Sequence, residues 1–294
     1  MAPVVETIGL TKRFGAAVAL DALDLEIAEG EVFGFLGPNG AGKTTTLRLL
    51  LGLIRPSAGV ARVFGRDAWA DPVPIHRRLG FVSADPPLWP QLTAHETLDL
   101  LAGLHGSVDA AYRDELVERY DLDLDKKVRA FSTGNRQKVA LIAAFMTRPE
   151  LLVLDEPTSG LDPLRKVVFR ACLAEAKARG QTVLLSSHLL GEVEASADRV
   201  GLLRRGRLVE TGTLEQLRHL SAVRIEASFA GPVPDLSGLE GVEGVRASDH
   251  QLSLHVHGAV APVLTRIAAA QPTHLTSREP SLEDLFLAHY GAED

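Results

Sequence analysis

Two short stretches of the chain carry residues that could bind and hydrolyse a nucleotide. The first is a glycine-rich loop after the apolar segment 32–36, with the sequence Gly37-Pro38-Asn39-Gly40-Ala41-Gly42-Lys43-Thr44. The second is the apolar run 151–154, which ends in Asp155 and Glu156. Glycine-rich backbone and a lysine can hold phosphates, while two carboxylates at a strand end can hold Mg²⁺ and position a water. Together they predict a nucleoside triphosphatase.

The polar residues at the end of the glycine loop are each expected to contact the phosphates or Mg²⁺. Its glycines let backbone N–H groups approach a phosphate, and the segment 43–53, which has helical spacing, offers its N-terminal dipole to the anion. We expect Lys43 to reach the β- and γ-phosphates and the Thr44 hydroxyl to bind Mg²⁺. Thr45 should lie on the α-phosphate side. A coincidental Gly-rich turn is the alternative, which the flanking strand and helix disfavour.

The two carboxylates differ in the direction that each is expected to face. Because successive side chains on a strand point opposite ways, Asp155 can face Mg²⁺ through its hydration shell while Glu156 reaches the attacking water as general base. A solvated acidic turn is the alternative. His188 follows the expected strand 182–186 and should emerge near the γ-phosphate, since ligands lie at the carboxyl ends of parallel strands. Taken alone, such a histidine is more often structural.

A second possible anion site lies at the start of the helix expected at 137–147. Ser132 is a good N-cap, and capping alone would explain it. However, Ser132 and Gly134 at a helix start could also bind an anion. Two anion sites in one chain imply either two ligands or two copies of the chain that share one.

The hydrophobic pattern predicts a mostly parallel α/β sheet. Expected strands and helices alternate along the first two thirds of the chain. The expected strands are 4–8, 19–27, 32–36, 60–64, 151–154, 182–186 and a hairpin over 200–211; the expected helices are 43–53, one starting at a Thr93–Glu96 capping box, 109–120 and 137–147.

The pattern changes after about residue 220. Strands are expected at 223–229 and 252–256, and helices at 259–270 and 281–290. We therefore expect a main domain over 1–220, with a helical part at about 85–150, and a small α+β accessory domain over 221–294.

Composition limits the partners that the chain could have. The 294 residues carry a net charge of −7, which disfavours nucleic acid as a partner. A single cysteine, Cys172, excludes a disulfide framework and any Cys-rich metal site. Because no signal peptide and no apolar run of about 20 residues is present, we expect a cytoplasmic protein that reaches a membrane only through a partner.

The order of these motifs resembles the ATP-binding subunit of an ABC transporter over about residues 4–220. Residues 37–44 resemble Walker A, 151–156 Walker B, 159–162 the D-loop and His188 the switch histidine. The resemblance implies a P-loop NTPase fold of the ABC type, with an antiparallel β subdomain and a helical subdomain, and the cofactors ATP and Mg²⁺. Phe14 takes the place of the aromatic residue that stacks on adenine.

The same resemblance implies partners. Residues 132–137 lie where the family has its signature, so two subunits, identical or paralogous, should face head to tail. Ser132, Gly134 and Asp162 would then contact the ATP held by the other subunit. The tail 281–287 is similar to exporter-type subunits, which power a separate transmembrane permease from the inner face of the membrane. The loop 88–90 with Leu92 is our candidate for the permease contact, or else part of the helical-subdomain core.

The sequence departs from the family at two places. Thr133 replaces the first glycine of the signature, and Asn135-Arg136 precede Gln137. Ala84 lies where the family has a glutamine or glutamate that approaches Mg²⁺. Asp85 or solvent could take over that role.

Two rival functions remain at this stage. One is a soluble ABC ATPase that acts on a ribosome or a DNA complex, but such relatives carry coiled coils, zinc insertions or two cassettes with a basic linker. The other is a regulatory nucleotide-binding module without turnover, which the presence of Glu156 disfavours.

Overall fold

The computed structural model describes residues 2–106, 108–219 and 223–278. It divides into two compact units, Met1–Thr211 and Gly212–Asp294, so the division falls at Thr211 where the sequence suggested residue 220. Each unit is described by itself below.

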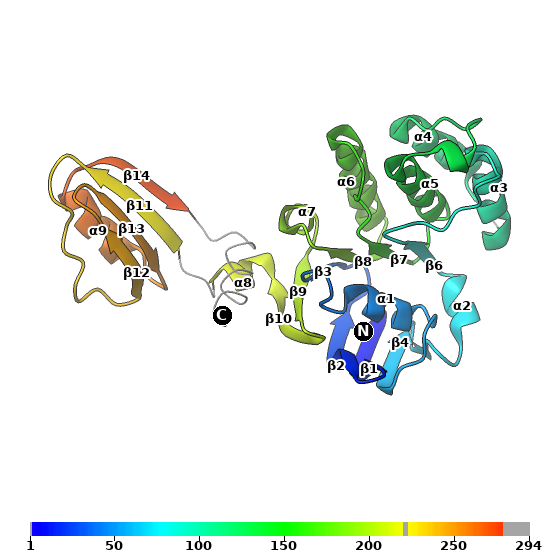
Figure 1. The fold of residues 1–294 in the computed structure, drawn as a ribbon, viewed down its shortest axis with the longest axis horizontal. Helices are drawn as coiled ribbons and strands as arrows, with labels where there is room; N and C mark the ends of the chain where they lie inside the picture. The colour runs from blue at the N-terminus through cyan, green and yellow to red at the C-terminus, as the bar shows by residue number, and fades with distance from the viewer. Residues whose placement is uncertain (1, 107, 220–222, 279–294) are drawn as a thin grey trace. The chain divides into compact units, whose positions relative to one another are not determined.

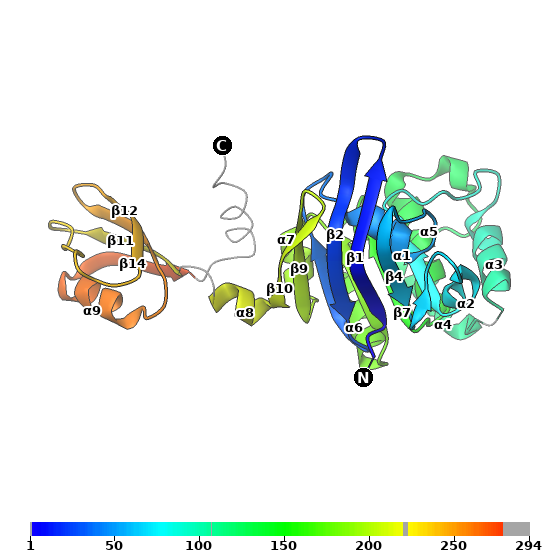
Figure 2. The same cartoon turned by 90° about the horizontal axis from the view of Figure 1, so that it is seen from below.

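The first unit begins with an antiparallel sheet in the order β2-β1-β4-β5, and Figure 2 shows its first three strands side by side. Its strands are β1 (Val5–Phe14), β2 (Ala17–Ile27), β4 (Ala58–Val63) and β5 (Arg66–Asp67). β1 and β2 form a long hairpin in which Val5 pairs with Ile27 and Phe14 with Ala17. The turn at residues 15–16 forms the tip of this hairpin.

The central sheet of the first unit has six strands in the order β10-β9-β3-β8-β7-β6. They are β3 (Val32–Leu36), β6 (Leu79–Val82), β7 (Leu151–Asp155), β8 (Thr182–Ser187), β9 (Arg199–Arg204) and β10 (Arg207–Thr213). β6, β7, β8, β3 and β9 are paired in parallel. The carboxyl ends of β3, β7 and β8 therefore meet at one edge, and the expected parallel α/β sheet is confirmed.

Helices cover both faces of the central sheet. α1 (Lys43–Leu50) lies between the two sheets in Figure 1, while α6 (Pro163–Ala178) and α7 (Leu190–Glu194) lie on the opposite side of the central sheet. A short helix, α2 (Pro72–His76), precedes β6. The apolar residues of α1 pack with those of both sheets into one core, which includes Leu10, Leu20, Phe33, Phe35, Leu47, Leu50, Val153 and Leu184.

A helical part follows β6 and contains α3 (Ala94–His105), α4 (Ala110–Tyr120), the 3₁₀ turn Val128–Ala130 and α5 (Thr133–Met146). The predicted capping box is confirmed, since Glu96 N donates to Thr93 Oγ1 at 3.1 Å and Thr93 N donates to Glu96 Oε2 at 2.7 Å. α5 begins at Thr133 rather than at Gln137, because Ser132 Oγ accepts a hydrogen bond from Asn135 N at 3.3 Å.

The second unit contains α8 (Leu214–His219), β11 (Val223–Phe229), β12 (Val242–Ala247), β13 (Gln251–Val256), α9 (Ala261–Ala269) and β14 (Pro272–Arg278). Its sheet is antiparallel in the order β12-β13-β11-β14. α9 covers it through a core that includes Ile225, Leu254, Val263 and Ile267. β12 and β14 were not expected, because they are mostly exposed and lack apolar alternation. The helix expected at 281–290 lies outside the described residues.

Within the described ranges, we find no helix that is both long enough and apolar enough to cross a membrane.

Candidate functional site

The glycine loop joins β3 to α1 and packs directly against neighbouring backbone. A Cβ atom on Gly37 would lie 2.5 Å from the Leu203 carbonyl oxygen of β9. Gly42 has a φ of +114°, and a Cβ atom there would lie 2.7 Å from the Ala19 carbonyl oxygen. Because no side chain fits at either position, glycine is required for this path of the backbone.

The remaining predicted residues of the loop lie on the same turn and at the start of α1. Ala41 N donates to the Pro38 carbonyl at 3.1 Å, and Gly40 has a φ of +81°. Asn39 is exposed within this turn, and Thr45 lies half-buried on the first turn of α1. The structure thus places these residues in the loop between β3 and α1 or on the first turn of α1, an arrangement that suits phosphate binding.

Lys43 is a buried ammonium group within the loop. Its side chain is 6 % exposed, and its Nζ donates to the Gly37 carbonyl at 2.5 Å and to the Pro38 carbonyl at 3.4 Å. Its charge partner is Glu156, whose Oε1 lies 3.4 Å away. A buried ammonium is costly unless it is paired, so this position suits an anion. The loop and Lys43 together fit a phosphate group.

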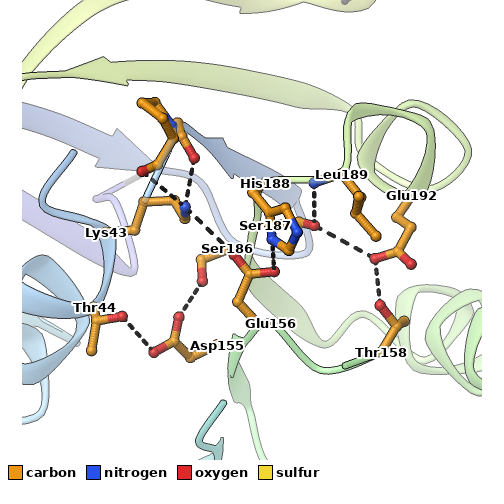
Figure 3. A network of polar contacts seen from close by, with 12 residues as sticks. Lys43, Thr44, Asp155, Glu156, Thr158, Ser186, Ser187, His188, Leu189 and Glu192 are labelled. Carbon is orange, nitrogen blue, oxygen red and sulfur yellow. Dashed lines mark hydrogen bonds and ion pairs between the residues drawn. The ribbon is translucent and has the colours of Figure 1, made fainter. Parts of the chain in front are cut away.

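Asp155 ends β7 and faces the start of α1, as Figure 3 shows. Its Oδ2 accepts from Thr44 Oγ1 at 2.9 Å and its Oδ1 accepts from Ser186 Oγ at 2.5 Å. Both partners are uncharged hydroxyls, so a cation bound here would neutralise the buried carboxylate. A threonine hydroxyl and a carboxylate beside a phosphate cradle fit Mg²⁺, which keeps several waters and takes few protein ligands.

Glu156 lies just beyond the strand in a left-handed conformation, with a φ of +47°. Its backbone N donates to the Ser186 carbonyl at 3.0 Å, which holds the residue beside β8. Its carboxylate meets Lys43 through Oε1 and His188 Nδ1 through Oε2, the latter at 2.7 Å (Figure 3). The two acidic residues therefore face different partners, as expected, but the turn at Glu156 rather than strand alternation separates them.

His188 follows β8 and lies at the edge where β3, β7 and β8 end. Its imidazole is about half exposed and contacts only Glu156 among the polar contacts of the described residues. The structure thus brings five predicted residues together: Lys43, Thr44, Asp155, Glu156 and His188.

The start of α5 packs against the loop that follows Glu156. A Cβ atom on Gly134 would lie 2.3 Å from the Gly160 carbonyl oxygen. The buried Gln137 side chain donates through Nε2 to the Pro157 carbonyl at 3.1 Å. In the described part of the chain, the polar contact of the Ser132 side chain is the cap of its own helix. Its predicted contact with a nucleotide stays a prediction.

Asp162 and Phe14 lie at exposed positions. Asp162 caps α6, where Arg165 N donates to its Oδ1 at 3.0 Å, and this hydrogen bond lowers the pKa of Asp162 below its usual value. Phe14 lies at the tip of the β1–β2 hairpin with 53 % of its surface exposed. The Lys12 ammonium is 4.9 Å from its ring centroid. The exposed ring itself could stack on a flat ligand.

The loop after β6 contains Ala84, at the position where the family has a glutamine or glutamate. Ser83 Oγ donates to the Asp85 backbone carbonyl at 3.2 Å, and the Asp85 side chain is exposed. Whether Asp85 approaches a metal stays a prediction.

Sequence reasoning missed several residues of this site. Ser186 fixes Asp155, while Thr158 and Glu192 join segments beside His188. A hydroxyl at the end of a buried strand is a usable signal for Ser186. Glu192 gives no such signal, because only folding brings it to Thr158.

Comparison with known proteins gives consistent matches. The model of the ABC transporter family matches residues 20–159. The chain is 39 % identical over 221 residues to the bacitracin transport ATP-binding protein BcrA of Bacillus licheniformis, covering 74 % of this chain and 72 % of that one. It is 36 % identical to the daunorubicin resistance ATP-binding protein DrrA3 of Streptomyces coeruleorubidus, covering 97 % of this chain and 95 % of that one.

Solved structures resemble a large part of the chain. An ATP-binding subunit of an ABC transporter aligns with a TM-score of 0.68 and 32 % identity, over 73 % of this chain and 92 % of that one. A dimeric ATP-binding cassette in a post-hydrolysis state, bound to ADP and Pi, aligns with a TM-score of 0.64 over 71 % of this chain and 98 % of that one. Its identity is 24 %, so it shows the fold alone.

Proposed function

Because this chain belongs to the family of ABC transporter ATP-binding subunits and is an ATPase, we propose that it hydrolyses Mg²⁺-ATP at the edge where β3, β7 and β8 end. The observation that carries this proposal is the chain of contacts from Lys43 through Glu156 to His188, beside the Thr44–Asp155 pair. These contacts support a site in which Lys43 would bind phosphate, Glu156 would act as the base, and Thr44 and Asp155 would bind the metal.

Each of these residues has a separate role in the proposed reaction. Lys43 and the glycine loop hold the β- and γ-phosphates, and Phe14 stacks on the adenine. Thr44 and Asp155 hold Mg²⁺, which supplies charge neutralisation at the phosphates when bound. A bound phosphate competes with Glu156 for Lys43, so ATP would free the Glu156 carboxylate to accept the proton of the attacking water. His188 orients that carboxylate through its Nδ1.

The proposal includes a second ATPase subunit, either a second copy of this chain or a paralogue. Ser132, Gly134 and Asp162 lie around the junction of α5 with the loop 157–162. We propose that this junction caps the ATP held by a facing subunit, since a helix N-terminus favours an anion. The family signature is changed at Thr133, but Ser132 and Gly134 remain.

The partner in transport would be a separate transmembrane permease. Trp89 is 44 % exposed, and Pro90 beside it is also exposed, which favours the permease contact over a role in the helical core. The relatives are named for bacitracin transport and daunorubicin resistance, which supports export of an antibiotic-like compound from the inner face of the membrane. The net charge of −7 disfavours the rival role on a ribosome or DNA complex.

Replacing the proposed base tests this function. Glu156→Gln should lower ATP turnover by about 10²- to 10⁴-fold because an amide cannot accept the proton of the water. ATP affinity should stay close to that of the wild type, and size-exclusion chromatography with ATP should show an accumulated dimer. Glu118→Gln, at an exposed position on α4, is the matched control. Wild-type turnover in Glu156→Gln would remove Glu156 from the role of base.

The transport partner needs a separate measurement. Affinity purification of this chain from detergent-solubilised membranes should recover a polytopic membrane protein, and Trp89→Ser should weaken that recovery. Recovery of ribosomal proteins or DNA instead would favour the rival function.

A further inference from the structure

We propose that Glu192, on α7, is a positioning residue for hydrolysis, because its carboxylate ties the loop that carries Glu156 to the loop that carries His188. This inference rests on the proposed roles of Glu156 and His188. Glu192 itself touches neither of them; it acts through Thr158 and Ser187 (Figure 3).

Three segments meet at the Glu192 carboxylate. Thr158 Oγ1, on the loop after β7, donates to Glu192 Oε2. Ser187 Oγ, at the end of β8, lies 3.5 Å from the same oxygen. Lys166 Nζ, on α6, lies 2.9 Å from Oε1. The Glu192 side chain therefore joins the loop after β7, the end of β8 and α6.

The two hydroxyl partners lie next to the proposed catalytic residues in the chain. Thr158 is two residues beyond Glu156 and is buried, and Ser159 N donates to the Glu156 carbonyl at 3.0 Å. Ser187 precedes His188 directly, and Ser187 Oγ accepts from Leu189 N at 2.9 Å. This hydrogen bond joins the two residues on either side of His188. A shift of Glu192 would therefore move both ends of the 2.7 Å Glu156–His188 contact.

Packing at this junction leaves a hollow. A hollow of about 360 Å³ lies between α6 and α7, and its lining includes Thr158, Phe169, Leu189 and Glu192. His188 is 48 % exposed, so burial does not fix its ring. Where packing leaves space, polar contacts decide the geometry, and the Glu192 side chain, only 19 % exposed, supplies three of them. The charge of Glu192 also has a partner in Lys166, which makes a carboxylate suitable at this position.

A positioning role and a merely structural role predict different kinetics. If Glu192 only stabilised the fold, its loss would lower stability and would act equally with or without His188. If Glu192 sets the approach of His188 to Glu156, its loss should lower the rate of hydrolysis but not ATP affinity. Its effect should also disappear once the imidazole has been removed.

The experiment measures ATP affinity and single-turnover hydrolysis of the full chain with protein in excess, which detects slow rates. Glu192→Ala should lower the rate by about 10- to 100-fold with ATP affinity within about twofold of the wild type, because small misplacements of reacting groups are costly. The rate should fall less in Glu192→Gln than in Glu192→Ala. The amide oxygen can still accept a hydrogen bond from Thr158, although the ion pair with Lys166 is lost.

A double-mutant cycle with His188→Ala gives the decisive result. In that background Glu192→Ala should reduce the rate by less than about twofold. Equal losses in both backgrounds, or a wild-type rate in the single Glu192→Ala variant, would overturn the inference. A wild-type rate in His188→Ala alone would instead contradict the proposed role of the histidine, so the two failures are distinguishable.

Thr158 provides a matched pair should Glu192→Ala fold poorly. Thr158→Val removes the hydroxyl at nearly constant volume and should lower the rate as Glu192→Ala does. Thr158→Ser keeps the hydroxyl and should retain most of the wild-type rate. Equal rates in these two variants would show that the hydroxyl contact with Glu192 does not position the site.

Discussion

Lys43, the proposed phosphate-binding residue, is a buried ammonium whose charge pairing is incomplete. Its ammonium is enclosed by the Gly37 and Pro38 carbonyls, and its charge partner is the Glu156 carboxylate at 3.4 Å. That separation is longer than a charge-assisted hydrogen bond, so the pairing is incomplete. A phosphate that reached the loop would complete it. The same exchange would leave Glu156 available as a base, which couples binding to the chemical step.

Lys43→Ala should therefore abolish most of the ATP affinity. Each hydrogen bond to a charged group contributes about 1.5–3 kcal/mol, so the loss of two should weaken binding by about 10²- to 10⁴-fold. A fluorescent ATP analogue measures this directly. Lys126→Ala, at an exposed position, controls for a general change of charge. Unchanged affinity in Lys43→Ala would exclude Lys43 from the phosphate site.

The left-handed conformation of Glu156 indicates strain at the proposed base. With a φ of +47°, a residue with a Cβ atom is disfavoured by about 1–2 kcal/mol relative to glycine. We predict that the free energy of unfolding is about 1 kcal/mol higher for Glu156→Gly than for Glu156→Ala, although both variants lack the carboxylate. Chemical denaturation of the two variants gives the comparison. A lower stability for Glu156→Gly would show that this backbone conformation carries no strain.

At the scale of elements, buried strands and glycine turns were predictable, and contacts between loops were not. The run Leu151–Asp155 is apolar throughout, so its sequence indicates a buried strand. α6 was not predicted, although its buried residues Phe169, Cys172, Leu173 and Ala176 have helical spacing. The Thr158–Glu192 contact joins residues far apart in the chain, and no local pattern specifies it. For the same reason the motifs indicated residues of the candidate site but not the residues that hold its loops together.

The junction of α5 with the loop 157–162 is tight enough to test. Gly134→Ala would bring a Cβ atom within 2.3 Å of the Gly160 carbonyl oxygen, so the helix must move away from that loop. We expect a loss of stability and of ATP-dependent dimer formation. Gly103→Ala on α3 is the matched control, because a Cβ atom there meets nothing within 4 Å. That variant should gain up to about 1 kcal/mol from helix propensity. Thermal unfolding measures the stability of both variants. A similar gain in stability in Gly134→Ala and Gly103→Ala would contradict the close packing of α5.

At the scale of the whole molecule, the two units have separate cores. The core of the first unit joins two sheets and α1, and every proposed catalytic and phosphate-binding residue lies in that unit. The core of the second unit is formed by its own sheet, α9 and the chain between β11 and β12. Separate cores allow separate unfolding, since cooperativity comes from shared buried contacts.

We therefore predict two thermal transitions for the full chain, of which ATP shifts only one. At a ligand concentration of about 100 times Kd, ATP should stabilise the first unit by about 2.7 kcal/mol and leave the second unchanged. Ile267→Ala removes a fully buried side chain of α9 and should destabilise only the second transition, by about 2–5 kcal/mol. Differential scanning calorimetry with and without ATP measures both effects.

A shortened chain gives the complementary result. A chain that ends at Thr213 keeps β10 and the central sheet complete, so it should bind ATP with the affinity of the full chain. It should also retain only the transition that ATP shifts. A single transition that moves as a whole with ATP, or loss of binding in the shortened chain, would mean that the second unit completes the fold of the first. In that case the accessory unit would contribute to the ATPase itself rather than to its partners, because ATP affinity would depend on residues beyond the central sheet.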